Sequence, residues 1–179
     1  AHGMAIGDID RDGDVDVYFN NGGPAFVPES VQGNALWLND GKWSFRELPT
    51  GHSALTAANK PVFPHAALVS DLNNDSRPDL IVVDDSGRIS PHYRNEGDGK
   101  FRDATKESGL DIAGWAMGAS AGDFDGDGDI DIAATMIDLD VQTRLVSMKD
   151  QFADPTVRKE LAELAKRGLS HQLYRNNGD

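Results

Sequence analysis

The sequence contains no cysteine and no long hydrophobic run, and both absences exclude whole classes of site. Without cysteine there are no disulfide bonds, no thiolate metal sites and no CxxCH haem attachment. No apolar run approaches the roughly 18 residues of a membrane-spanning helix, so we expect no membrane insertion. The first residues, AHGMAIGD, are typical of a strand rather than of a signal peptide, as expected of a mature chain or an excised piece.

Positive charge is scarce. The 179 residues include 17 Lys and Arg against 30 Asp and Glu, which gives a net charge of −13 and argues against nucleic-acid binding. Thirteen of the 30 acidic residues lie in three short segments, with five, three and five in each. The charge therefore indicates metal sites more than it indicates a partner. The length and a hydrophobic content of 39% predict one globular domain, residues 1–179.

The three acidic segments are copies of one repeat. Residues 8–16 (DIDRDGDVD) and 123–131 (DFDGDGDID) share the spacing of their aspartates, and residues 71–79 (DLNNDSRPD) are a weaker copy. The preceding residues, HGMAIGD, HAALVSD and MGASAGD, align without a gap, and the following runs, VDVYF, PDLIVV and IDIAATM, are apolar and typical of strands. Each acidic segment is therefore predicted to be a loop between two strands.

A second shared element follows each loop. It reads LWLNDGKWSF at 36–45, HYRNEGDGKF at 92–101 and LYRNNGD at 173–179, and the Asn, Asp and Gly residues in it are typical of hairpin turns. Four antiparallel strands in roughly 50–60 residues indicate a propeller blade. We therefore predict an all-β fold of propeller blades at about 1–50, 62–105 and 114–179. The third blade stops in the turn before its fourth strand.

A little under three blades make an incomplete ring, because a propeller normally closes with about four or more. We therefore expect the other blades to be partners of this chain, supplied by the rest of a larger protein or by other subunits. The truncation at a hairpin turn favours the first of these alternatives.

The acidic loops have the oxygen pattern of a calcium site. With the first aspartate as position 1, side chains at positions 1, 3, 5 and 9 would point inward, and the carbonyl at position 7 would add a ligand toward the total of about six or seven. Gly13 and Gly128, at position 6, permit the sharp turn. A solvated acidic turn would explain a single loop, but three copies in one frame favour metal binding.

Other metals and loop types fit less well. An EF-hand needs a Glu at position 12, where this sequence has Phe19, Val82 and Ala134. Magnesium usually keeps several waters and needs fewer protein ligands, and zinc or copper would need nitrogen or sulfur ligands. The middle loop departs from the pattern at Asn73 and Ser76, and we expect the weakest binding there because fewer carboxylates surround the ion.

These loops and hairpins resemble the FG-GAP/VCBS repeats, which build the propeller of integrin α subunits and of many secreted bacterial proteins. The stretch SGLDIAGWAMGASAGDFDGDGDIDI followed by LYRNNGD is most similar to the cartilage-acidic-protein-like subgroup, which is associated with ASPIC/UnbV domains. The resemblance implies up to three Ca²⁺ sites, with ligands at positions 1, 3, 5, 7 (through its carbonyl) and 9. The implied ligands are Asp8, Asp10, Asp12, Asp14, Asp16, Asp71, Asn73, Asp75, Arg77, Asp79, Asp123, Asp125, Asp127, Asp129 and Asp131.

Two features lie outside the repeat frame. Residues 141–170 form an insertion that contains ADPTVRKELAELAKRGLS, and Asp154, Pro155 and Gly168 are placed as helix cap residues, which predicts a helix. His2 and His65 both lie six residues before a first aspartate and would face each other in a central channel. A metal or catalytic histidine pair is one reading of this placement, and ordinary strand histidines are the favoured one.

The sequence has no Walker loop and no HExxH motif, and its GxSxG match, GASAG at 118–122, lies in a predicted strand that leads into an acidic loop, not at the strand-to-helix turn that a nucleophile needs. We therefore favour a non-catalytic interaction or adhesion module with structural calcium, which acts outside the cell or in the periplasm and binds a protein or glycan ligand. One alternative is a lyase-type enzyme that acts on polysaccharides from a calcium-loaded propeller. Another is a subunit of a larger assembly that docks through the helix.

Overall fold

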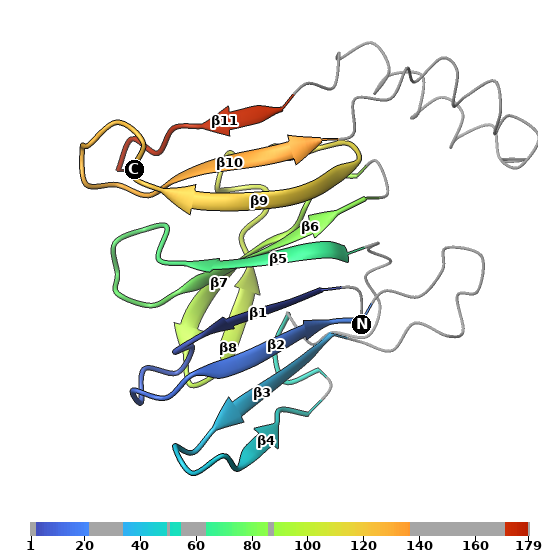
Figure 1. The fold of residues 1–179 in the computed structure, drawn as a ribbon, viewed down its shortest axis with the longest axis vertical. Helices are drawn as coiled ribbons and strands as arrows, with labels where there is room; N and C mark the ends of the chain where they lie inside the picture. Colours follow the sequence, from blue (N-terminus) through green and yellow to red (C-terminus); the bar gives the residue numbers. More distant parts are fainter. Residues whose placement is uncertain are drawn as a thin grey trace, which may run out of the picture.

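The computed structural model describes residues 3–21, 34–49, 51–54, 64–85, 88–136 and 171–178. These residues form three antiparallel sheets that follow one another along the chain (Figure 1). In each sheet the spatial order of the strands follows or reverses the sequence order, so every sheet is a simple meander. Two of the sheets have four strands and the third has three.

The strand bounds are as follows. The first sheet contains β1 (Gly3–Gly7), β2 (Asp16–Asn20), β3 (Ala35–Asn39) and β4 (Phe45–Glu47). The second sheet contains β5 (Pro64–Ser70), β6 (Asp79–Asp84), β7 (His92–Gly97) and β8 (Lys100–Asp103). The third sheet contains β9 (Ala116–Gly122), β10 (Asp131–Met136) and β11 (Gln172–Tyr174).

The registers of the three sheets agree with the repeat found in the sequence. In each sheet, the residue before the loop pairs with the aspartate at position 9; these pairs are Gly7↔Asp16, Ser70↔Asp79 and Gly122↔Asp131. Position 9 is thus the first residue of the second strand in every sheet. The acidic loop connects the first two strands at the same end each time, and Figure 1 shows the three loops on one side of the molecule.

The sheets pack face to face, and the composition of their strands explains why. β6 is buried at every position, as expected for the LIVV run of a middle sheet that is covered on both faces. β2 alternates between buried and half-buried residues because only one of its faces is covered by a neighbour among the described residues. The first strands β1, β5 and β9 lie next to one another, and one apolar core fills each of the two interfaces.

The all-β fold and the antiparallel four-stranded sheets are confirmed. The described sheets do not close a ring, and the blade bounds predicted above stay a prediction. The predicted helix at 141–170 and His2 lie outside the described residues, whereas His65 is exposed on β5. Within the described part of the chain, no helix is long and apolar enough to cross a membrane.

Candidate metal centre

The three acidic loops share an unusual backbone path. Positions 4 and 6 both have a positive φ in every loop; the residues and angles are Arg11 (66°), Gly13 (95°), Asn74 (58°), Ser76 (63°), Gly126 (81°) and Gly128 (96°). The turn expected at position 6 is therefore present, and a second left-handed residue at position 4 was missed. Asn and Gly adopt this conformation readily but Arg does not. The residue type at position 4 therefore indicates a left-handed conformation in only two of the three loops.

Each loop is folded around its own carboxylates. In the first loop, Asp8 Oδ2 accepts a hydrogen bond from the N–H of Gly13 at 3.1 Å, and Asp12 Oδ1 accepts one from Asp14 N–H at 3.0 Å. The corresponding bonds in the other loops are Ser76 N–H to Asp71 (2.8 Å), Arg77 N–H to Asp75 (2.8 Å), Gly128 N–H to Asp123 (3.0 Å) and Asp129 N–H to Asp127 (3.0 Å). These bonds leave other carboxylate oxygens of the loop available for an ion.

Position 9 is buried in all three loops: Asp16 and Asp79 are fully buried and Asp131 nearly so. The two oxygens of Asp16 accept hydrogen bonds from Ile9 N–H (2.7 Å) and Asn39 N–H (2.9 Å). Asp131 repeats this pattern with Phe124 N–H and Asn176 N–H at 3.0 and 2.8 Å. Position 9 therefore fastens the loop to the third strand, in addition to any role as a ligand.

The first loop brings three carboxylates together without a cation among them. One carboxylate oxygen each of Asp8, Asp10 and Asp16 lies within 4.8 Å of the others, and the buried Oδ1 of Asp8 has no hydrogen-bond partner among the described residues. Burial and the neighbouring carboxylates, Asp16 first among them, raise the pKa of Asp10, and burial raises the pKa of Asp16 against the hydrogen bonds that it accepts. The negative charge of this loop is thus uncompensated.

The third loop has the same cluster with an arginine at its edge. Oxygens of Asp123, Asp125 and Asp131 lie within 4.8 Å of one another. Arg175, which follows β11, lies 2.6 Å from Asp125 and 3.1 Å from Asp127. The hydrogen bond from Asp129 N–H, followed by that from Arg175, lowers the pKa of Asp127.

The middle loop contains its own counter-charge. Its carboxylates do not form a comparable cluster among the described residues. Instead, Arg77 Nη2 lies 2.6 Å from Asp75 Oδ2, and Asn73 Nδ2 donates to the same oxygen at 2.9 Å. Although burial alone would raise the pKa of Asp75, the bonds from Arg77 N–H and Asn73 and the charge of Arg77 lower it.

The remaining implied ligands lie beside the clusters rather than in them. Asp12, Asp14 and Asp129 are not in either three-carboxylate group. Asp14 lies against Gly41 and Asp129 against Gly178, so close that a Cβ on either glycine would clash with the carboxylate. Position 7 therefore contacts the turn after the third strand, which the spacing of the aspartates did not reveal.

Sequence reasoning also missed one asparagine in each hairpin turn. Asn95 Nδ2 donates to the carbonyl of Ile9 at 2.8 Å, and Asn176 Nδ2 donates to the carbonyl of Leu72 at 2.9 Å. Both acceptors are position 2 of the loop in the preceding sheet. In the described part of the chain, the Asn39 side chain donates only within its own sheet, to the carbonyl of Val15 at 3.2 Å. The NxG pattern was read as a turn signal, but the same asparagine also joins neighbouring sheets.

Comparison with known proteins agrees with this repeat. Residues 71–134 match the family model of the FG-GAP-like repeat, a range that includes the second and third loops. No curated protein matches the chain. The chain thus contains an FG-GAP-like repeat, and the subgroup resemblance stays an expectation.

Proposed function

We propose that this chain is a calcium-stabilised segment of a β-propeller that serves as an interaction module. The observation that carries the proposal is the cluster of Asp8, Asp10 and Asp16, with its unpaired buried oxygen. A buried carboxylate oxygen without a partner is costly, and a bound cation would remove that cost.

The donor chemistry favours calcium. Every available ligand atom in the first and third loops is an oxygen, and side-chain and backbone oxygens alternate along the chain, which suits a hard ion with many oxygen ligands. The residues fit the ion without rearrangement of the strands, because position 9 is already held by two hydrogen bonds in both loops.

Calcium would act on stability rather than on chemistry. The ion would offset the burial and the carboxylate repulsion that together raise the pKa of Asp10, and it would tie the start of the loop to the start of the second strand. Because the ligands are brought together only in the folded chain, binding and folding are linked.

The partners that we propose are further sheets of the same kind, together with a protein or glycan ligand. Met4 and Ile6 of β1 are 63% and 61% exposed. Their counterparts in the repeat frame, Ala67 and Val69 of β5, pack on the first sheet. An exposed apolar face at that position supports another sheet as its cover. We place the protein outside the cell or in the periplasm, where calcium is abundant enough for sites of modest affinity.

Thermal unfolding with and without calcium tests this function. For chelated protein we expect the melting temperature to rise by about 5–10 °C in millimolar calcium, as saturated sites of this kind would produce. The variant Asp8→Asn should lose about half of that rise, because it removes charge from one of two clusters. Asp71→Asn, at the same position of the middle loop, is the matched control and should keep the rise. If calcium leaves the melting temperature of the wild-type protein unchanged, the proposal is disproved.

A further inference from the structure

The first and third loops use the same carboxylate oxygens for their backbone hydrogen bonds. At position 3, Oδ1 accepts the N–H of position 5, at 3.3 Å for Asp10 and at 3.3 Å for Asp125. At position 5, Oδ1 accepts the N–H of position 7, at 3.0 Å for both Asp12 and Asp127. One oxygen of each carboxylate thus holds the turn, and Oδ2 is the oxygen that remains for a cation.

The two loops differ in what these Oδ2 atoms contact. In the first loop, Oδ2 of Asp10 and of Asp12 makes no hydrogen bond or ion pair with the described residues. In the third loop, Arg175 contacts both atoms: its Nε lies 2.6 Å from Oδ2 of Asp125, and its Nη2 lies 3.1 Å from Oδ2 of Asp127. One arginine therefore covers the two oxygens that remain open in the first loop.

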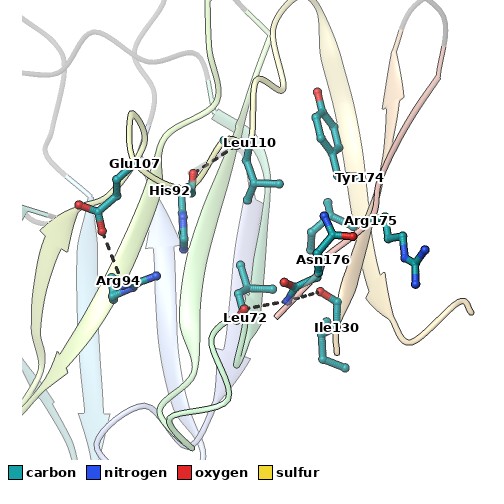
Figure 2. Close-up of a pocket in the computed structure, with 13 residues that line it drawn as sticks. Leu72, His92, Arg94, Glu107, Leu110, Ile130, Tyr174, Arg175 and Asn176 are labelled. Atoms are coloured by element: carbon teal, nitrogen blue, oxygen red, sulfur yellow. Dashed lines mark hydrogen bonds and ion pairs between the residues drawn. The ribbon is translucent and has the colours of Figure 1, made fainter. Parts of the chain in front are cut away.

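The position of Arg175 in the repeat explains why only one loop has this contact. Arg175 precedes the asparagine of the hairpin turn, and its counterparts are Leu38 in the first sheet and Arg94 in the second. Leu38 is buried in the apolar core, and Arg94 lies 3.6 Å from Glu107. In Figure 2, which shows the cavity of about 300 Å³ between the second and third sheets, Arg94 is joined to Glu107 and Arg175 points away from both. Among the described residues, this hairpin position reaches the acidic loop in the third sheet only.

The contact of Arg175 is one that a divalent ion can replace. The side chain of Arg175 is 63% exposed, and those of Asp125 and Asp127 are 36% and 31% exposed, so solvent screens both ion pairs. Calcium carries twice the charge and can take several oxygens of the loop at once. Because the arginine must first leave, binding at this loop has a lower apparent affinity than it would have without the arginine.

We propose that Arg175 is a tethered competitor of the ion at the third loop, which covers Asp125 and Asp127 and leaves them when calcium binds. The first loop has no such competitor among the described residues, so the first loop fills at a lower calcium concentration than the third. This inference rests on the proposed function, because it concerns the same ion. It adds that the residue before the hairpin asparagine sets the calcium affinity of the loop in its own sheet.

A calcium titration of chelated protein, followed by NMR, tests this role. The amides of Gly13 and Gly128 report on the first and third loops, and in the wild type we expect Gly128 to respond at the higher calcium concentration. Arg175→Gln should lower the Gly128 midpoint about tenfold, because two ion pairs and a repelling charge are removed, and should leave Gly13 unchanged. Arg94→Gln, at the same position of the second sheet, changes the net charge equally and should leave both midpoints as they are.

Two further measurements distinguish competition from a merely structural role. In the wild type, the Nε–H signal of Arg175 should shift with the same midpoint as Gly128 and should exchange faster with water once calcium is saturating. In chelator, Arg175→Gln should melt about 2 °C below the wild type, because the loop loses its counter-charge. In saturating calcium that difference should disappear.

The outcomes separate this inference from the proposed function. If Gly13 responds to calcium but the Gly128 midpoint stays the same or rises in Arg175→Gln, Arg175 is not a competitor, although the proposed function stands. An Nε–H signal that saturating calcium leaves in place would overturn the inference in the same way. If neither glycine responds to calcium, the proposed function is wrong and this inference is wrong with it.

Discussion

The loops at residues 8–16 and 71–79 follow the same backbone path but balance their carboxylates in different ways. Both have left-handed residues at positions 4 and 6, and in both the position 1 carboxylate accepts the N–H of position 6. The first loop leaves three carboxylates facing one another, whereas the middle loop pairs Asp75 with Arg77. The same turn therefore forms both around carboxylates that no cation balances among the described residues and around a carboxylate paired with an arginine, so backbone geometry alone does not decide how the charge of a loop is balanced.

The prediction with the largest expected effect compares the stability of variants at two buried aspartates of position 9, Asp16 and Asp79. Asp16 uses both oxygens as acceptors, whereas among the described residues Asp79 accepts a hydrogen bond only at Oδ1, from Asn95 N–H at 2.8 Å, and its Oδ2 lies 3.7 Å from Nε2 of the buried His92. Asp16→Asn places an NH₂ group against an N–H donor and should lower the free energy of unfolding by about 2 kcal/mol or more. Asp79→Asn can turn its NH₂ toward His92 Nε2, which has no hydrogen-bond partner among the described residues, and should cost less than about 1 kcal/mol.

Both variants are measured by urea unfolding in millimolar calcium. Asp16→Asn also removes a negative charge and so relieves repulsion among the carboxylates of the first loop. Calcium would already offset that repulsion, so its relief would not mask the lost hydrogen bond. Similar losses in the two variants would show that position 9 has the same role in both loops and would contradict the distinction drawn here.

The features that the sequence predicted are local ones. The spacing of aspartates and glycines sets turns over a few residues, and the apolar runs beside them set strands, so the antiparallel sheets followed from the repeat. The way in which each loop balances its negative charge did not follow from the repeat. Arg175 meets Asp127 across 48 positions, and Asn95 meets Ile9 across 86. Contacts at such separations depend on how the sheets pack, and the sequence of a single loop does not determine that packing.

The next effect tests the asparagine that joins neighbouring sheets. Asn95 is fully buried and donates to the carbonyls of Ile9 and Pro78, so Asn95→Ala leaves two acceptors without this donor. We expect a loss of about 2 kcal/mol in the free energy of unfolding. Asn39→Ala removes two exposed bonds, the one that Asn39 donates to Val15 and the one that it accepts from Gly41 N–H, and should cost less than about 0.5 kcal/mol.

The same pair of variants reports on the first loop. Ile9 N–H is bonded to Asp16, so a loosened Ile9 should weaken calcium binding at this loop. In an NMR titration, the amide of Gly13 should respond at a higher calcium concentration in Asn95→Ala than in the wild type, while the amide of Gly128 in the third loop keeps its midpoint. A common shift of both midpoints would indicate general destabilisation instead of coupling between one loop and the next sheet.

The smallest effect on stability comes from removing the internal cation of the middle loop. The side chains of Arg77 and Asp75 are 37% and 23% exposed, so solvent screens their ion pair and Arg77→Gln should cost less than about 1 kcal/mol. The variant leaves Asp71, Asp75 and Asp79 without the charge that balances them, and the loop should then resemble the first one. We therefore expect the Ser76 amide to shift on addition of calcium in Arg77→Gln and to shift much less in the wild type. Arg46→Gln, on β4, changes the net charge equally and should leave Ser76 as it is in the wild type. If Ser76 responds to calcium equally with and without Arg77, the arginine does not replace an ion, and the contrast between the two loops lies in Asn73 instead.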